Sequence, residues 1–225
     1  MHGSLSFDSF VLAASLSDLS LAPDAREHAD LVEFRMDLAS EPLSALRAYG
    51  GDLPVLATNR AEREGGAAAG ESRLDALVRA AREPAVVAVD VELSAVETGD
   101  ADGVLAAADE AGVATVVSAH DFEGTPSRDR MRETLAAAAD RGTVGKLAVT
   151  AADAGDVLDL LAVTRERTRA GDRVATTAMG EPGRHARAVA PLYGSRIGYA
   201  PPAAAGATAP GQYDLATLAG LVETL

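Results

Sequence analysis

The chain contains a single lysine, and its position is unusual. Lys146 lies in the apolar segment 144–149, while the other nineteen of the twenty basic residues are arginine. A buried ammonium is costly unless it is paired, so Lys146 either reaches a strand end or pairs with Asp90 or Glu92, or it serves chemistry. In the chemical explanation, burial and nearby arginines lower the pKa of the amine, and the neutral amine attacks a ketone to form a Schiff base. The protonated imine then makes the adjacent carbon easier to deprotonate.

A residue suited to moving that proton is His120, which follows the apolar segment 114–118. The ordinary histidine pKa of about 6.5 lets an imidazole accept and return a proton near neutrality. A catalytic histidine needs an orienting partner, and Glu64 is the best candidate carboxylate. A lone histidine at a strand end is often structural, but a buried lysine in the same chain favours proton transfer.

Three arginines follow other apolar segments: Arg35, Arg60 and Arg187. A guanidinium can bind a carboxylate through two parallel hydrogen bonds. Each arginine alone says little, because arginine is common on surfaces. Together with Lys146 they predict a substrate that carries both a carboxylate and a ketone.

The segments that position these residues alternate between short apolar runs and alanine-rich helical stretches. Strands are predicted at 10–15, 31–35, 54–58, 86–92, 114–118, 144–149, 174–178 and 196–199. Helices are predicted at 22–29, 41–49, 71–82, 102–111, 127–141, 152–169, 184–192 and 214–224. Ser127 and Asp214 are expected N-caps, and Gly112 and Gly142 expected C-caps. Eight strand–helix alternations favour one (β/α)8 barrel domain over residues 1–225.

An open doubly wound sheet is the alternative fold, but its GxGxxG fingerprint is absent from the chain. In a (β/α)8 barrel the active site forms where the strands end, which is where the lysine, the histidine and the arginines are expected. Residues 200–209 are rich in alanine, proline and glycine. They form either a loose surface loop or part of a mobile lid, which we assign to residues 200–212.

The composition is that of a globular protein with an acidic surface. It contains 48% hydrophobic and 24% charged residues, and no apolar run approaches the ~20 residues of a membrane span. The chain contains no cysteine and starts without a secretion signal, so a cytoplasmic protein without a thiolate metal site is expected. The net charge of −14 argues against nucleic-acid and membrane partners. The scarcity of lysine reflects either a GC-rich genome or adaptation to high salt.

The motifs of the chain resemble those of type I 3-dehydroquinate dehydratases, the Schiff-base enzymes of the shikimate pathway. The matching segments are Glu33-Phe34-Arg35-Met36-Asp37, Arg60 with Arg63-Glu64-Gly65-Gly66, Asp90-Val91-Glu92, Ser118-Ala119-His120-Asp121-Phe122 with Thr125-Pro126, Gly145-Lys146-Leu147-Ala148, Ala178-Met179-Gly180 with Arg187, and Ala209-Pro210-Gly211-Gln212. Each segment alone is weak, but the set occurs in family order from residue 31 to residue 212. That order makes the resemblance highly specific.

The resemblance implies the dehydration of 3-dehydroquinate to 3-dehydroshikimate. Lys146 would form the imine, His120 would be the general acid and base, and Glu64 would orient His120. No metal, nucleotide or flavin cofactor is implied, because the lysine itself provides the electron sink. A homodimer is expected.

The resemblance also implies a substrate-binding set. Its members are Glu33, Arg35, Arg60, Arg187, Thr208 and Gln212. Arg187 would bind the carboxylate, Glu33, Arg35 and Arg60 would contact the ring hydroxyls or their surroundings, and Gln212 would close the lid. Thr208 stands where the family has a serine. Bacterial members also carry a longer N-terminal hairpin under the barrel, whereas about nine residues precede the first expected strand here.

Two other functions remain open. A class I aldolase also uses a strand lysine, although the three arginines are not arranged as an obvious sugar-phosphate site, for which the turn at 179–183 is the nearest match. A non-catalytic barrel that binds a sugar acid would be marked by the loss of Lys146 or His120, and both residues are present. The compound that becomes trapped on the lysine by borohydride would discriminate among these functions.

Overall fold

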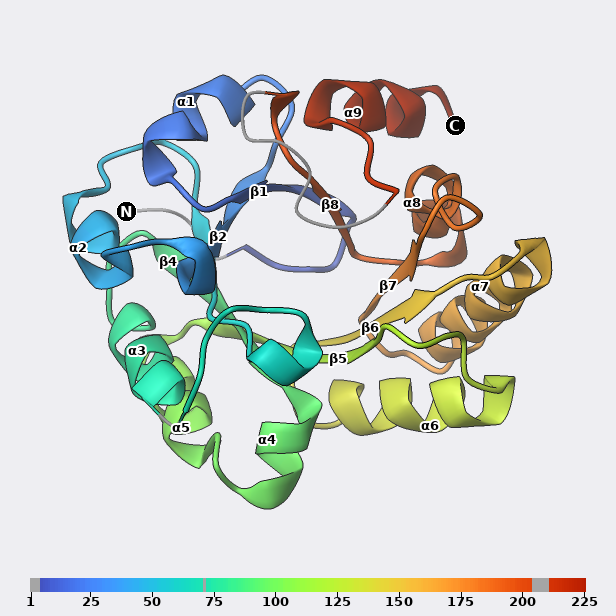
Figure 1. Ribbon diagram of the computed structural model, residues 1–225, viewed down its shortest axis with the longest axis horizontal. Coiled ribbons are helices and arrows are strands. Elements are labelled where there is room, and N and C mark those ends of the chain that lie inside the picture. The colour runs from blue at the N-terminus through green and yellow to red at the C-terminus, as the bar shows by residue number, and fades with distance from the viewer. Residues whose placement is uncertain (1–4, 71, 204–210) are drawn as a thin grey trace.

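The computed structural model describes residues 5–70, 72–203 and 211–225, and its centre is a sheet of eight parallel strands (Figure 1). The strands are β1 (Val11–Leu16), β2 (Leu31–Arg35), β3 (Val55–Thr58), β4 (Val86–Glu92), β5 (Ala114–Asp121), β6 (Val144–Thr150), β7 (Val174–Met179) and β8 (Ile197–Ala200). Strand β1 pairs with both β2 and β8. A single bridge between Val174 and Ser195 joins β7 to the residues just before β8. The predicted (β/α)8 barrel is confirmed, and the doubly wound sheet is wrong.

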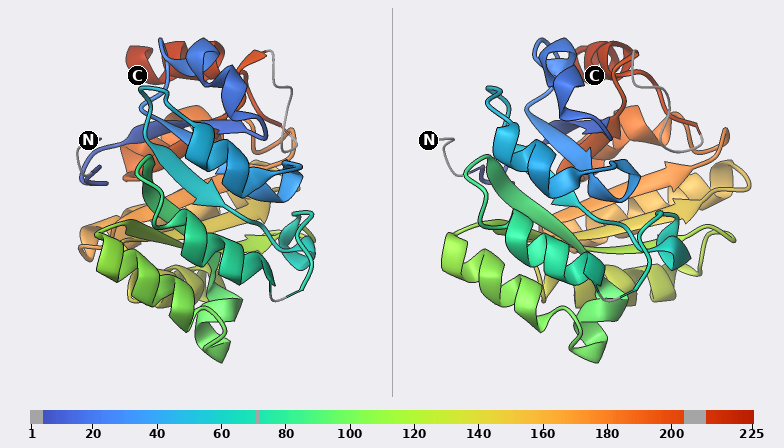
Figure 2. Two further views of the ribbon diagram at one scale, coloured as in Figure 1. Left: turned by 90° about the vertical axis from the view of Figure 1, so that its left-hand side faces the viewer. Right: turned by 60° about the vertical axis from the view of Figure 1, so that its left-hand side comes forward.

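Helices connect the strands and cover the outside of the barrel (Figure 2). They are α1 (Ala22–Ala25), α2 (Pro42–Ala48), α3 (Ser72–Ala80), α4 (Leu93–Thr98), α5 (Asp102–Ala111), α6 (Arg128–Ala139), α7 (Ala154–Arg169), α8 (Ala186–Val189) and α9 (Leu215–Thr224). Helix α4 was not predicted, because it begins directly at the end of β4 without a turn signal. No helix in the described part of the chain is long and apolar enough to cross a membrane.

The helix ends follow the predicted caps with one exception. Gly112, Ser127 and Asp214 cap their helices as expected. Gly142 is not a C-cap, because α6 ends at Ala139 and Asp140 occupies the capping position in a right-handed conformation. A side chain at 142 would nevertheless be crowded, since a Cβ atom there would lie 2.7 Å from Cγ2 of Val117 and 3.1 Å from the Thr115 carbonyl oxygen.

The barrel interior is filled by an apolar layer to which every strand contributes. The buried members of this layer are Phe7, Val11, Ala13, Leu31, Leu56, Ala88, Val116, Val144, Ala175, Ile197 and Tyr199. Phe7 precedes β1 and is only 1% exposed, so the short N-terminal segment itself supplies apolar packing to this layer. Separate apolar clusters lie between the strands and the helices, and the barrel therefore rests on two packed layers.

Candidate active site

The candidate site begins two residues beyond the apolar interior layer. Side chains on a strand alternate between the two faces, so the residue two positions after an interior one also points into the barrel. Glu33 follows interior Leu31 by two positions in this way, as Asp90 follows Ala88 and Lys146 follows Val144. The apolar layer thus forms the floor of a polar pocket at the carboxyl ends of the strands.

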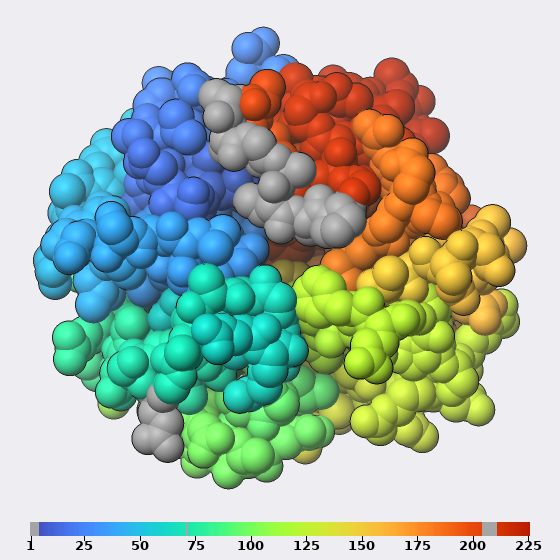
Figure 3. Space-filling view, in the orientation of Figure 1, coloured from blue at the N-terminus to red at the C-terminus, as the bar shows by residue number. Residues whose placement is uncertain are grey.

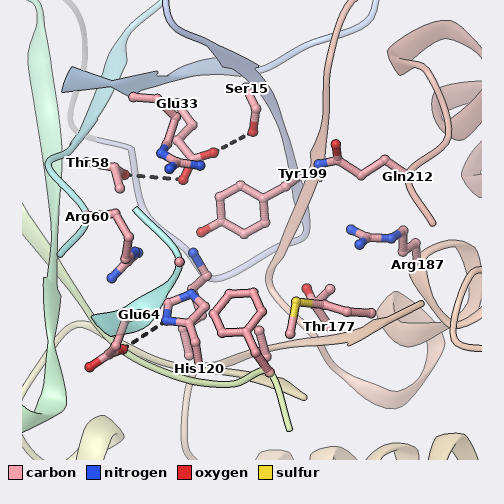
Figure 4. A pocket seen from close by; sticks show the side chains of 16 residues that line it. Ser15, Glu33, Thr58, Arg60, Glu64, His120, Thr177, Arg187, Tyr199 and Gln212 are labelled. Atoms are coloured by element: carbon pink, nitrogen blue, oxygen red, sulfur yellow. Dashed lines mark hydrogen bonds and ion pairs between the residues drawn. The ribbon is translucent and has the colours of Figure 1, made fainter. Parts of the chain in front are cut away.

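The pocket is a cavity of about 260 Å³. It is lined by Ser15, Glu33, Arg35, Thr58, Arg60, Glu64, Gly65, His120, Phe122, Lys146, Ala148, Thr177, Met179, Arg187, Tyr199 and Gln212 (Figure 4). All predicted site residues except Thr208 are in this set, and Thr208 lies outside the described residues. Residues 204–210 of the predicted lid also lie outside the described residues. The lining contains four cations, Lys146 and three arginines, against two carboxylates.

Lys146 is buried, with 6% of its surface exposed, and its Nζ atom lies 3.1 Å from Oδ2 of Asp90. The pairing expected with Asp90 or Glu92 is therefore made with Asp90. Burial alone would raise the pKa of Asp90, but the charges of Arg60 and Lys146 outweigh it and hold that pKa well below its usual range. The Tyr199 ring lies over the amine, with its centroid 4.2 Å from Nζ. Lys146 is thus both paired and exposed to the cavity.

Arg60 is the centre of a buried network beside the lysine. Its guanidinium lies 2.7 Å from Asp90 and donates to the Ser118 hydroxyl at 2.7 Å and to Glu92 at 3.3 Å. Glu92 is held from the other side by Arg73 at 2.6 Å. Because most of these contacts join charged partners, the network fixes Asp90 against Lys146 firmly.

His120 and Glu64 form the predicted pair. Nδ1 of the imidazole lies 3.0 Å from one carboxylate oxygen of Glu64, and the other oxygen accepts a hydrogen bond from the Ser94 hydroxyl at 3.1 Å. Burial and the charges of Arg60 and Lys146 hold the pKa of His120 well below its ordinary value. The histidine is therefore neutral at pH 7 and ready to accept a proton, and Nε2 is the nitrogen left for it.

The loop after β3 and the segment after β5 hold this pair together. The short helix η3 (Glu62–Glu64) ends at Gly65, whose φ of 77° and close approach to the Phe122 ring exclude a side chain. Phe122 in turn stacks on His120, with the ring centroids 6.2 Å apart. In Figure 3 the two segments, teal and lime green, lie side by side near the middle of the face.

Glu33 and Arg35 are fixed by local partners on one side of the pocket. Glu33 accepts hydrogen bonds from Ser15 and from Thr58, the latter at 3.2 Å. Arg35 donates two hydrogen bonds to Asp37, at 2.9 and 2.7 Å. Both side chains are therefore oriented before any ligand binds.

Arg187 and Gln212 lie across the pocket from Glu33 and Arg60 (Figure 4). Burial lowers the pKa of Arg187 to about 10, which still leaves a cation at neutral pH. Gln212 follows Gly211, which approaches the Gly180 carbonyl so closely that a Cβ atom would lie 2.4 Å from its oxygen. The contact ties Gln212 to the end of β7.

Three residues that support the predicted side chains were not themselves predicted: Ser15, Thr58 and Tyr199. Ser15 and Thr58 orient Glu33, and Tyr199 covers Lys146. The register of the strands was the available signal, because each of these residues follows an interior apolar residue by two positions.

Comparisons with known proteins agree on one family. The model of the type I 3-dehydroquinase family matches residues 10–225. The 3-dehydroquinate dehydratase of Halobacterium salinarum is 57% identical over 225 residues, which cover 98% of this chain and 100% of that protein. The Haloarcula marismortui enzyme of the same name is 55% identical, covering 98% of each. The crystal structure of 3-dehydroquinate dehydratase from Geobacillus kaustophilus is 28% identical and superposes with a TM-score of 0.86, covering 97% of this chain and 91% of that one.

Proposed function

Because the chain belongs to the type I 3-dehydroquinase family and is a 3-dehydroquinate dehydratase of the shikimate pathway, we propose that Lys146 and His120 carry its reaction through a Schiff base. The observation that carries this proposal is the placement of a buried lysine amine and a neutral, carboxylate-oriented imidazole in one cation-rich cavity. Membership of this family argues against the two other functions considered, a class I aldolase and a non-catalytic barrel that binds a sugar acid.

The first step is the addition of the Lys146 amine to the ketone carbon of the substrate. The Lys146 ammonium first gives a proton to neutral His120, which frees the amine for this addition. His120 then returns the proton to the hydroxyl of the carbinolamine, which leaves as water and yields an iminium ion whose positive charge replaces that of the ammonium. Asp90 is held next to this nitrogen by Arg60 and Ser118, so its carboxylate can stabilise the iminium charge without moving.

His120 then removes a proton from the carbon next to the iminium, and the electron pair of that C–H bond moves into the iminium group to form an enamine. The enamine expels the hydroxyl group one carbon further on, which leaves as water with the proton that His120 returns. Hydrolysis of the product imine releases 3-dehydroshikimate and restores Lys146. Glu64 holds Nδ1 throughout, so Nε2 carries the proton.

Substrate binding is divided between the two sides of the cavity. Arg187 binds the carboxylate, and Glu33, Arg35 and Arg60 contact the ring hydroxyls on the other side. Gln212 and Thr208, within a lid at 200–212, cover the bound substrate. We further propose that the enzyme is a cytoplasmic homodimer adapted to high salt. The acidic composition and the relatives from Halobacterium and Haloarcula support salt adaptation.

Reduction with borohydride in the presence of 3-dehydroquinate tests the Schiff base. Because Lys146 is the only lysine, we expect all of the reduced adduct on the peptide that contains residues 145–149, as measured by mass spectrometry after proteolysis. The only other amine is the N-terminus. An adduct found there alone, or none, would exclude the imine mechanism.

The role of Arg187 is tested by Arg187→Lys, which keeps the charge but loses the planar fork. We expect the KM for 3-dehydroquinate to rise about tenfold or more, because one of two parallel hydrogen bonds to the carboxylate is lost. Arg184→Lys is the matched control, since Arg184 stacks on Tyr213 outside the cavity lining. Binding of the substrate's methyl ester should differ little between the wild type and Arg187→Lys. Equal losses for acid and ester would point to general disruption.

A further inference from the structure

The Tyr199 hydroxyl is a buried donor with no hydrogen-bond partner among the described residues. Tyr199 lies near the end of β8, is 7% exposed and lines the cavity. An unsatisfied buried hydroxyl costs free energy, and such groups are rare in folded proteins. Burial, together with Glu33 and Asp90, raises the pKa of Tyr199 well above its ordinary value. The group therefore remains a phenol that can donate.

The two carboxylates nearest in charge to this hydroxyl already accept from other donors. Glu33 accepts from Ser15 and Thr58, and Asp90 is held by Arg60, Ser118 and Lys146. The hydroxyl points toward the side of the cavity that holds Thr58 and Arg60, and away from Arg187 (Figure 4). Because Tyr199 lines the cavity, a molecule bound there can supply the partner that the described residues do not.

We propose that the Tyr199 hydroxyl donates a hydrogen bond to the substrate hydroxyl that lies across the ring from the carboxylate. The proposal rests on the proposed function, in which Arg187 binds the carboxylate and Lys146 bonds to the ketone carbon. In 3-dehydroquinate the ring carbon opposite the carboxylate-bearing carbon carries a hydroxyl and is itself bonded to the ketone carbon. With Nζ held 4.2 Å from the Tyr199 ring centroid, this hydroxyl comes to lie near the phenol.

Tyr199→Phe separates this role from a structural one, because it keeps the ring over Lys146 and removes only the unpaired hydroxyl. We expect kcat/KM for 3-dehydroquinate to fall about tenfold. The Tm of the free enzyme should rise by roughly 2–4 °C, because a buried unsatisfied group is removed. A Tm below that of the wild type would show that the hydroxyl has a partner in the free protein, and unchanged kcat/KM would show that it has none in the complex. Either result would overturn the proposal.

An analogue of the substrate that lacks this one hydroxyl identifies the partner. We expect the wild type and Tyr199→Phe to convert the analogue with equal kcat/KM, because the bond is absent in both cases. A tenfold difference that persisted with the analogue would overturn the assignment to this hydroxyl. If borohydride instead failed to trap substrate on Lys146 in the wild type, the proposed function would fail, and that result is separate from any effect of the variant.

Tyr49→Phe is the matched control. The Tyr49 hydroxyl donates to the Leu53 carbonyl at 3.0 Å, and this tyrosine does not line the cavity. Its removal should lower the Tm and leave kcat/KM unchanged, which is the reverse of the pattern expected for Tyr199. The same pattern in both variants would overturn the proposal, since it would reflect the loss of any tyrosine hydroxyl.

Discussion

Lys146→Met is expected to reduce kcat for 3-dehydroquinate by ~10⁴-fold or more, because no other side chain of this chain can form an imine. The variant should still fold. Methionine has a similar length, and Asp90 keeps its contacts with Arg60 and Ser118, so no carboxylate is left without a partner. Turnover is measured by the appearance of the conjugated ketone of the product, and folding by circular dichroism.

Lys146→Arg distinguishes the nucleophile from its charge. Arginine preserves a cation beside Asp90 and beneath the Tyr199 ring, but it does not form a Schiff base with a ketone. We expect this variant to be as inactive as Lys146→Met and to give no borohydride adduct. Turnover of Lys146→Arg within tenfold of the wild type would show that the lysine contributes only its positive charge and not a nucleophilic amine.

The barrel was predictable because the strands and helices follow each other with regular spacing. Apart from helix α4, which was not predicted, the differences concern segment ends, where local signals compete with packing. Strand β5 continues to Asp121, beyond the predicted end at residue 118, since it pairs with β6 from Val116 to Asp121. The predicted helix 184–192 becomes α8 followed by the short helix η4 (Ala190–Tyr193), because Pro191 has no backbone N–H to donate within it.

The polar contacts that hold the site were harder to predict than its charged residues. A lone lysine and a histidine after a strand are distinctive in composition, whereas Ser15 and Thr58 belong to residue types that occur throughout the chain. Their importance follows from strand pairing, because β1 and β3 are the two neighbours of β2 and bring these hydroxyls against Glu33. Pairing partners from distant segments cannot be read from local sequence.

The chain as a whole is acidic, whereas the groups that face the cavity are mostly cations. The chain carries a net charge of −14, yet the cavity lining has four cations and two carboxylates. Three carboxylates behind the lining, Asp37, Asp90 and Glu92, pair with Arg35, Lys146 and Arg60, so the cation-rich lining is not a region of net positive charge. An anionic substrate is therefore attracted by groups within a few ångströms, because interactions with the acidic surface are screened by salt over about 8 Å at physiological ionic strength.

His120→Ala is expected to lower kcat by ~10²–10⁴-fold, the usual effect of removing a general acid and base. The borohydride adduct on Lys146 should still form, because water can assist the addition of the amine to the ketone. This combination of lost turnover and retained adduct separates His120 from Lys146. His28→Ala is the matched control, since His28 lies outside the cavity lining. Turnover of His120→Ala within a few-fold of the wild type would assign the histidine a structural role.

The pH dependence of the wild type tests the same assignment. Only the neutral imidazole can accept a proton, so activity is lost as the pH falls through the pKa of His120. Burial and the charges of Arg60 and Lys146 place that pKa well below its ordinary value, so the acidic limb should lie well below pH 6.5. The dependence of kcat/KM on pH reports the pKa values of groups in the free enzyme. The titration of His120 should therefore not change kcat/KM between about pH 6.5 and 7.5. A loss of half the activity near pH 6.5 would mean that the imidazole titrates as it does in water, and that burial and the cations around it do not keep it neutral.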